Sequence, residues 1–294
     1  MILSKKYNVF LTVLLLCTSA SLRGNLIFSD NFESATNSNL TNNNNVVTST
    51  LTWYSALEDG RVRAVEDTVL GGAGNTALEL TSPDTFRRMG GQFTSTTLSA
   101  TEGEALELRF DMRFTESPAN NIYGFRFGLY NSNGTLMTQS NPNGKNQPDE
   151  QNDDFGYYTR MASGTATATT ELIREPSGNN PTGGATVTGE VILTNSGTPA
   201  RIEDQLMHSF VYTLTRLSGG DLGFTVRMDG NLIGSAVDTD PLTGTFDTLY
   251  FSKGNISSDF TVDNVQLSVI PEPGTLLLMG ITMGAFFLLH RRRR

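Results

Sequence analysis

A strict alternation of apolar and charged residues over Ala105–Phe114 constrains the fold of this chain more than any other feature. Leu106 and every second residue after it are apolar, whereas the residues between them are charged. Successive side chains of a β-strand point to opposite faces of the sheet. The segment therefore predicts an antiparallel strand with one buried face and one face in water. Residues 122–130 repeat the pattern, with glycine and arginine between aromatic side chains.

Other segments of the body also have the length and composition of strands, separated by glycine, asparagine or aspartate turns. Asp229 and Gly230 lie between two such segments, and this dipeptide favours a tight hairpin turn. The further candidate strands are residues 91–98, 155–161, 185–193, 208–217, 245–252 and 259–269. No stretch of ten or more residues in the body has helical spacing with caps. We therefore expect an all-β chain in which residues 25–270 form a single antiparallel jelly-roll β-sandwich.

Two polar stretches interrupt this pattern of strands. Residues 34–50 are mostly Asn, Thr and Ser, and residues 164–186 are rich in Thr, Gly, Pro and Asn. Neither stretch carries enough apolar side chains to offset the conformational entropy that is lost on ordering. We expect both to be loops, apart from a short strand at residues 171–174.

The N-terminus has the three parts of a secretory signal peptide. Lys5 and Lys6 precede an apolar run at residues 9–17, and small residues lead to Ala20. This order predicts a signal helix over residues 1–20 that directs the chain to the Sec export machinery and is then removed. A lipoprotein anchor on Cys17, the chain's one cysteine, is disfavoured because a leucine precedes it. The exported protein then has no disulfide and no thiolate metal site.

The C-terminus also has three parts in a fixed order. Pro271, Glu272 and Pro273 precede an uncharged run at residues 274–289, and the chain ends with Arg291, Arg292, Arg293 and Arg294. As a helix, this run spans about 24 Å, somewhat less than the roughly 30 Å of a hydrocarbon core. We expect a transmembrane helix whose arginine end stays in the cytoplasm, so that everything before the triplet lies outside. A plain membrane anchor is the simplest function for such a tail.

Residues 271–294 resemble the PEP-CTERM sorting signal of bacterial surface proteins, a segment also known as the C-terminal domain of some ice-binding proteins. The resemblance implies that an exosortase, a membrane transpeptidase, cuts near Pro271-Glu272-Pro273. The protein would be anchored in the inner membrane of a Gram-negative-type bacterium and then released or transferred to the cell surface or exopolysaccharide matrix. Ice binding would need a flat threonine array, and Thr165, Thr167 and Thr169 form only a short one.

The charge of the body restricts its partners. Without residues 1–20 and 271–294, the chain retains 15 basic and 29 acidic residues, a net charge of −14. Such a surface repels phosphate groups, so nucleic acid and anionic lipid headgroups are poor partners. Divalent cations are better ones.

The body has a family resemblance of its own. Residues 26–33 and 260–267 frame it as the opening and closing strands frame concanavalin A-like, laminin G-like and carbohydrate-binding jelly-roll domains. The resemblance implies a non-catalytic module that binds carbohydrate, with the exopolysaccharide as its ligand. Sugar rings stack on flat aromatic faces, for which the candidates are Trp53, Tyr54, Tyr157 and Tyr158. The last two are neighbours on one strand and must point to opposite faces, so we expect one of them to be exposed.

Calcium is the metal that the sequence supports best. Hard cations take six to eight oxygen ligands, and the segment with Asp149, Asp153 and Asp154 offers several carboxylates. A second set, Asp30, Glu33, Asp259 and Asp263, would meet only if the first and last strands pair. The alternative is that all these residues are solvated acids in turns.

Catalysis has weaker support. Glu102, Glu104 and Glu107 are similar in spacing to the carboxylates of sandwich endoglucanases, but Glu104 departs from the family pattern. Glu107 continues the charged face of a strand, where no pocket raises its pKa. His208 is the one histidine of the body, which excludes a His-rich zinc site, and no Gly-x-Ser-x-Gly motif accompanies it. We expect no enzyme; a purely structural surface protein and a polysaccharide-degrading enzyme are the alternatives.

Overall fold

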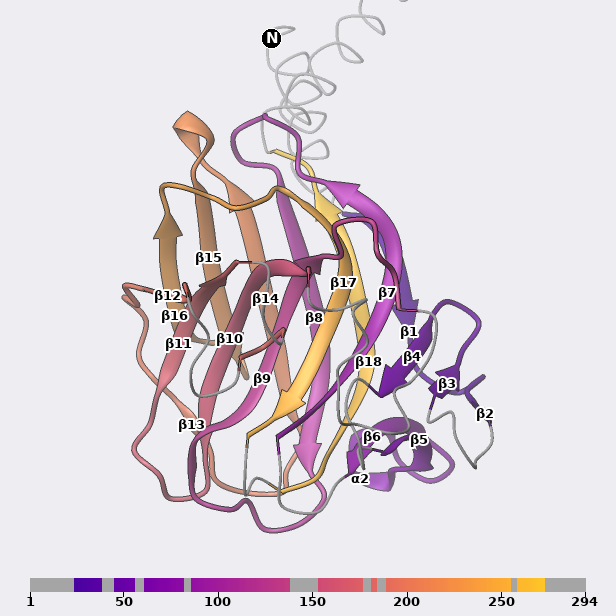
Figure 1. The fold of residues 1–294 in the computed structure, drawn as a ribbon. Helices are drawn as coiled ribbons and strands as arrows, with labels where there is room; N and C mark the ends of the chain where they lie inside the picture. The colour runs from indigo at the N-terminus through magenta and orange to yellow at the C-terminus, as the bar shows by residue number, and fades with distance from the viewer. Residues whose placement is uncertain are drawn as a thin grey trace, which may run out of the picture.

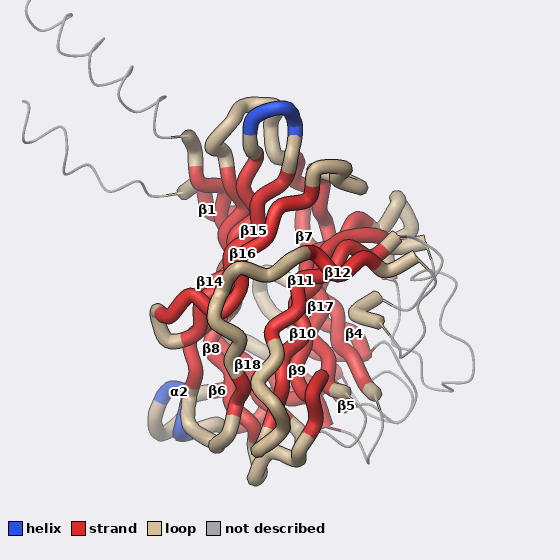
Figure 2. The backbone as a smooth tube through the Cα atoms, turned by 90° about the vertical axis from the view of Figure 1, so that its left-hand side faces the viewer, coloured by secondary structure: helices blue, strands red, loops and turns tan. Residues whose placement is uncertain are grey.

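Two β-sheets packed face to face make up the body of the protein, as a computed structural model of the chain shows (Figure 1). Figure 2 shows the two layers side by side. The structure describes residues 24–38, 45–55, 61–81, 86–137, 153–176, 181–183, 189–254 and 258–272. This arrangement confirms the expected all-β jelly-roll sandwich. The expected signal helix and transmembrane helix lie outside these ranges, and no helix within them is long and apolar enough to cross a membrane.

The first sheet has eight strands, which in spatial order are β16 (Asn231–Asp238), β15 (Leu222–Met228), β14 (His208–Arg216), β8 (Ala105–Phe114), β18 (Phe260–Ile270), β6 (Thr76–Thr81) and β5 (Arg61–Glu66), with β1 (Asn25–Asp30) beside β18. The second has ten, namely β12 (Val191–Leu193), β11 (Thr170–Glu175), β10 (Phe155–Ser163), β9 (Asn121–Asn131), β17 (Thr245–Lys253), β7 (Arg87–Thr97), β4 (Thr52–Ser55), β3 (Asn45–Val47) and β2 (Thr36–Ser38), with β13 (Arg201–Ile202) beside β10. Only the β10–β13 pair is parallel among the described strands. Two short helical turns are α2 (Thr68–Gly71) and η2 (Ser218–Gly220).

The strand with the strict alternation has the predicted bounds. β8 covers Ala105–Phe114, and its even-numbered side chains are buried while most of the odd-numbered ones are not. The predicted hairpin is also present, since Asp229 and Gly230 connect β15 to β16 with φ angles of 51° and 80°. The strands that sequence analysis missed are β2 to β6 and β13, each of six residues or fewer. Four of them, β2, β3, β4 and β13, have four residues or fewer, too few positions to define a period.

The expectation that residues 34–50 form a loop is wrong in part. β2 and β3 form a small antiparallel hairpin at the edge of the ten-stranded sheet, where β3 pairs with β4. Val46 and Leu51 are buried in the core, although the residues around them are polar. Two apolar anchors and backbone pairing to an existing sheet edge therefore order a segment whose composition resembles that of a loop.

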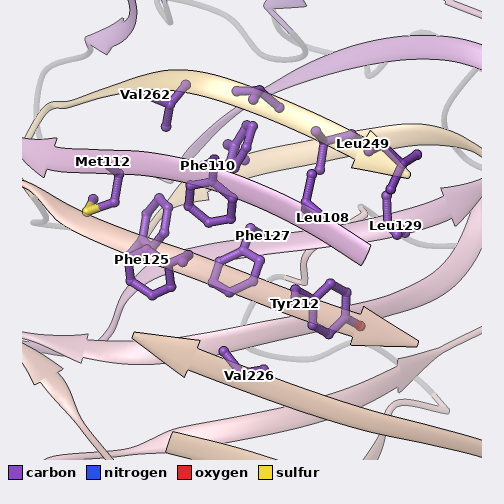
Figure 3. Close-up of a cluster of buried hydrophobic side chains, with 14 of the residues drawn as sticks. Leu108, Phe110, Met112, Phe125, Phe127, Leu129, Tyr212, Val226, Leu249 and Val262 are labelled. Atoms are coloured by element: carbon purple, nitrogen blue, oxygen red, sulfur yellow. The ribbon is translucent and has the colours of Figure 1, made fainter. Parts of the chain in front are cut away.

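The core lies between the sheets and is rich in aromatic rings (Figure 3). The ring of Phe110 lies 5.0 Å from that of Phe210 on the neighbouring strand and 4.9 Å from that of Phe127 across the sandwich. Trp53 belongs to the same cluster and is 0% exposed, with Phe251 stacked against it at 6.0 Å. These contacts hold β4 and the centre of the ten-stranded sheet in place.

The two ends of the described chain meet at one end of the sandwich. β1 pairs with β18, with Asn25 opposite Val269. On its other side β18 pairs with β8, up to Ile270 opposite Ala105. The triplet that begins at Pro271 therefore follows a strand that is paired on both sides, with no linker between them.

Candidate functional site

The outer face of the ten-stranded sheet, which points away from the core, carries a second buried layer. Three tyrosines on this face each lie directly opposite a glycine of the neighbouring strand. The pairs are Tyr250 with Gly90, Tyr158 with Gly128, and Tyr130 with Gly156. A Cβ atom on Gly128 would lie 2.5 Å from the Cβ of Tyr158, so glycine is what allows the ring to lie across the neighbouring strand. The three rings pack with Met137 and Ile173.

Three arginines form a row across the same face. Arg160 of β10 lies opposite Arg126 of β9, and Ser252 of β17 lies between Arg126 and Arg88 of β7. Adjacent strands are about 4.8 Å apart, so the arginine row (Arg88, Arg126 and Arg160) extends over about 14 Å. The three residues are 0%, 7% and 8% exposed. Like charges directly opposite each other destabilise a sheet, so the row requires partners.

Arg160 has partners of the usual kind. Its guanidinium donates to Glu171 at 2.5 Å and lies 3.8 Å from Glu190. The same group lies 4.1 Å from the ring centre of Tyr123, a favourable cation–π geometry. The positive charge at this end of the row is therefore compensated.

Arg88 and Arg126 also bind the backbone of a short covering segment (residues 181–183), which is fully buried over the sheet. Arg88 Nη1 donates to the carbonyl oxygen of Pro181 at 2.6 Å. Arg126 Nη1 donates to the carbonyl oxygen of Thr182 at 2.6 Å and also to that of Gly183. Burial lowers the pKa of both arginines, because a guanidinium in a low-dielectric interior loses its hydration.

The covering segment is also held through the backbone N–H of Thr182. The Thr182 N–H donates to the Tyr130 hydroxyl at 2.7 Å and to Glu175 Oε2 at 2.9 Å. Thr182 has a φ of +65°, a left-handed conformation that is unfavourable for a β-branched residue. The contacts with the sheet therefore impose a strained backbone on the segment.

Two buried carboxyl groups flank the arginine row. Burial raises the pKa of Glu175 to about 8 and that of Asp154 to about 8 as well. Glu175 Oε2 accepts from the Tyr130 hydroxyl, and Asp154 Oδ2 accepts from the Tyr250 hydroxyl at 2.5 Å. Glu175 Oε1 and Asp154 Oδ1 have no hydrogen-bond partner among the described residues. Both groups are therefore protonated at neutral pH.

Next to this layer lies a polar groove of about 270 Å³. Its lining consists of Thr48, Ser49, Thr50, Leu51, Thr52, Tyr54 and Gln92. The turn at its edge is held by Thr48, whose N–H donates to the Leu51 carbonyl at 2.9 Å and whose hydroxyl donates to Asp30 at 2.6 Å. Tyr54 is partly exposed and packs against the tyrosine layer. The groove therefore combines one aromatic ring with several hydroxyl groups and an amide.

The other three predicted sugar platforms are buried, which corrects the prediction for them. Trp53 lies in the core, where its indole N–H donates to Asp30 at 3.1 Å. Tyr157 points into the core and donates to Asp238 at 3.1 Å. Tyr158 does point to the opposite face, but it donates to Glu190 there and is 0% exposed. Its ring is buried because the outer face has a second layer, which residues far away in the sequence complete.

The predicted calcium ligands do not converge. Asp30 binds Trp53 and Thr48, and Asp259 accepts from Lys253 at 2.6 Å. The first and last strands do pair, as the second ligand set required, but the carboxylates point to different partners along them. The described residues contain no group of three acidic or histidine side chains that could hold a metal ion. Asp149 lies outside them, so a calcium ion there stays a prediction.

The remaining acidic candidates have separate partners as well. Glu33 accepts from the N–H of Thr76 at 3.1 Å, and Asp263 accepts from Asn75 at 2.9 Å. Burial raises the pKa of Asp263. Asp153 accepts from the hydroxyl of Thr135 at 3.1 Å. These contacts stabilise turns and strand ends.

Two of the residues considered for catalysis, Glu107 and His208, each have charged partners in the structure. Glu107 forms an ion pair with Arg109 at 2.7 Å on the outer face of the eight-stranded sheet, as the alternation predicted. His208 Nδ1 lies 2.7 Å from Asp229, and its Nε2 lies 3.1 Å from Asp204. The imidazole therefore ties the β15–β16 turn to the start of β14.

Sequence analysis missed the arginine row and its carboxyl partners. One signal was available: arginine or tyrosine recurs with glycine at every second position of residues 124–130 and 156–160. Such a face resembles a solvated one, because arginine is seldom buried. The burial depends on the covering segment, which no local pattern reveals.

Residues 269–294 match the PEP-CTERM protein-sorting motif, which confirms the resemblance of the tail. The motif indicates a surface protein that an exosortase sorts. The match begins at Val269, inside β18, and includes Pro271 and Glu272. Pro273 and the four terminal arginines lie outside the described residues. No curated protein matches the chain.

Several solved structures are similar in fold at low sequence identity. The carbohydrate esterase of the Shiga toxin-encoding bacteriophage phi24B is 16% identical over 74% of this chain and 90% of that chain, with a TM-score of 0.42. The globular domain of T. cruzi calreticulin is 14% identical over 88% and 94%, with a TM-score of 0.47. The exoplasmic/lumenal domain of VIP36 in its Ca²⁺/Man-bound form is 10% identical over 73% and 81%, with a TM-score of 0.41.

Proposed function

We propose that this protein is exported, processed by an exosortase and displayed at the cell surface or in the exopolysaccharide matrix, where its sandwich binds carbohydrate without catalysing a reaction. The observation that carries the proposal is the sorting motif, which starts in the last strand of the folded body.

The groove beside Tyr54 supports carbohydrate as the ligand. A sugar offers apolar C–H faces and hydroxyl groups, which suit an aromatic ring beside hydroxyl and amide side chains. Tyr54 alone among the four predicted platforms is not fully buried. The groove is shallow and polar, as expected for a site that binds the side of a polysaccharide chain.

Processing of the tail is tested by the intact mass of the native protein from the cell surface or culture medium. We expect a C-terminus near Pro271 to Pro273 and the loss of Arg294. Replacing Glu272 with alanine within the triplet should leave the longer form in the membrane fraction. A surface form that keeps Arg294 would refute sorting by cleavage and leave a plain membrane anchor.

Carbohydrate binding is tested by calorimetric titration of residues 24–272 with a neutral glucose hexamer and with exopolysaccharide from the source bacterium. We expect saturable binding, which Tyr54→Ala weakens about tenfold because it removes the stacking ring. The matched variant Tyr54→Phe keeps the ring and should lose less than about threefold. Absence of heat with every sugar would leave a purely structural surface protein. Release of reducing ends in the same mixtures would instead establish a polysaccharide-degrading enzyme.

A further inference from the structure

The outer face of the eight-stranded sheet carries a second polar groove, on the opposite side of the sandwich from the groove beside Tyr54. Its volume is about 310 Å³. Four adjacent strands line it, with Ser29 of β1, Asn264 and Gln266 of β18, Arg109, Phe110 and Asp111 of β8, and Ser209, Phe210 and Val211 of β14. The two phenylalanine side chains are buried in the core. The side chains that face the groove are therefore polar, apart from that of Val211.

Four of these side chains form a row across the sheet. In the strand register, Arg109 lies opposite Val211 of β14 and opposite Gln266 of β18. Gln266 in turn lies opposite Ser29 of β1. Adjacent strands are about 4.8 Å apart, so the row extends over about 14 Å. Within the described part of the chain, the side chains of Gln266 and Ser29 make no hydrogen bond, so their amide and hydroxyl groups are available to a ligand.

A β-bulge in β18 shapes the groove beside this row. Asp263 lies opposite Asp111 and Gln266 lies opposite Arg109, so three steps along β18 match two steps along β8. Asn264, inside the bulge, is exposed and has a φ of 51°, a left-handed conformation that few residues other than glycine adopt. Its Nδ2 donates to Asp111 Oδ2 at 3.0 Å. Bulges of this kind redirect a side chain and are frequent beside binding sites.

The charged side chains of the groove are held in fixed orientations. Asp111 accepts from the Ser209 hydroxyl at 2.5 Å as well as from Asn264. The Arg109 guanidinium donates through Nε to Glu107 at 2.7 Å, and both of its Nη groups are without a partner among the described residues. Arg109 and Asp111 are two positions apart on β8, so they project from the same face. The groove thus presents a guanidinium and a carboxylate side by side.

These groups select an uncharged ligand that is rich in hydroxyl groups. Two carboxylates, Glu107 and Asp111, accompany the one guanidinium of Arg109, so an anion would be repelled. A hydroxyl group both donates and accepts, so it can bind a guanidinium, an amide and a carboxylate alike. A row of such partners about 14 Å long suits several consecutive sugar rings.

We propose that this groove is a second binding site for a neutral polysaccharide, so that one domain holds two glycan chains on opposite sides of the sandwich. The proposal rests on the carbohydrate-binding function proposed above and adds a second site to it. The core separates the two sheets, which pack about 10 Å apart, so a short oligosaccharide cannot reach both grooves at once. Two sites on opposite faces allow the domain to cross-link separate chains of a polymer.

The first experiment is an NMR titration of the native protein with a neutral glucose hexamer. We expect saturable shifts in two separate groups of amide signals, one around Tyr54 and one around Gln266. Gln266→Ala should weaken binding in the second group by about tenfold and leave the first within about twofold. Tyr54→Ala should have the converse effect. Thr225→Ala, on β15 of the same sheet and outside the groove, is the matched control and should change neither affinity by more than about twofold.

Asn264→Gly tests the role of the bulge. Glycine adopts a positive φ readily, so this variant keeps the backbone while it removes the amide that orients Asp111. We expect it to weaken binding around Gln266 by about threefold or more, with no change around Tyr54.

The second experiment is light scattering of the native protein mixed with exopolysaccharide from the source bacterium. We expect large cross-linked particles, which Gln266→Ala and Tyr54→Ala each abolish although each variant still binds the polymer. Shifts around Tyr54 alone, or cross-linking that survives Gln266→Ala, would overturn the second site and leave the carbohydrate-binding function standing. If neither the hexamer nor the exopolysaccharide binds, both proposals fail.

Discussion

Replacing Trp53 with alanine should lower the free energy of unfolding by about 3–5 kcal/mol, the range for truncating a large buried aromatic side chain. Trp53 is 0% exposed and packs between Phe32 and Phe251. The truncation also leaves Asp30 without the indole N–H as a donor, and burying an under-satisfied carboxylate adds to the loss. Urea unfolding followed by circular dichroism measures the change.

Two variants separate packing from hydrogen bonding at this position. Trp53→Phe keeps most of the ring and loses the N–H donor, so we expect a smaller loss of about 1–2 kcal/mol. Tyr54→Ala changes the neighbouring residue, which is partly exposed on the opposite face, and should also cost less than Trp53→Ala. An unchanged unfolding midpoint in Trp53→Ala would mean that the indole is at the surface, where it could again serve as a sugar platform.

The second large effect concerns Glu175 and the pH dependence of stability. Burial raises the pKa of this carboxyl group to about 8, whereas the ordinary pKa of a glutamate is 4.5. Between these pH values the folded protein holds a proton that the unfolded chain has released, so the free energy of unfolding falls as the pH rises. The stabilisation by this group is complete below about pH 4.5 and is lost as the pH passes through 8.

Glu175→Gln should remove this dependence, because the amide resembles the protonated acid and still offers one oxygen to Thr182 and Tyr130. At pH 9 the variant should be more stable than the native protein by about 2–4 kcal/mol, and the difference should vanish towards pH 5. The groups facing Glu175 that also affect its charge are Tyr130, Tyr158, Arg88, Arg126 and Glu190. Thermal melts at each pH measure the effect.

Glu175→Ala serves as the control for this result. It removes the titrating group and also the acceptor for the Thr182 N–H, so it should destabilise the protein at every pH. A Glu175→Gln variant whose stability runs parallel to that of the native protein across pH 5–9 would show that the carboxyl group is not buried under the covering segment.

The fold could be predicted from the sequence because a long strand with one buried and one solvent-exposed face alternates between apolar and polar residues. β8 contains ten residues that alternate without a fault, and its structural bounds agree with the pattern. β10 shows where the signal ends: eight of its nine residues are buried, so neither face can be recognised from polarity. Residues 155–161 were expected to form a strand from their length and composition, not from an alternation of polar and apolar residues.

The candidate site was harder to predict than the fold. Sequence analysis identified Tyr54 as a sugar platform because it is aromatic. Its side chain lines the groove together with the turn at residues 48–51, which the sequence did not predict. One of Tyr157 and Tyr158 was expected to be exposed, because the two side chains point to opposite faces of the sheet. That expectation assumed that the outer face of the sheet is in contact with solvent. Residues 181–183 cover that face from about 25 residues further along the chain. Tertiary contacts of this range leave no trace in local composition.

The pairing of β18 on both sides has a mechanical consequence for a protein displayed at a surface. A load applied at Ile270 acts along the strand axis, since the chain leaves the sheet at that residue. It therefore shears the hydrogen bonds to β8 and β1 together, and no single bond at the edge bears the load first. A domain tethered in this way should withstand drag from flowing liquid better than one tethered through an edge strand, which would peel away bond by bond.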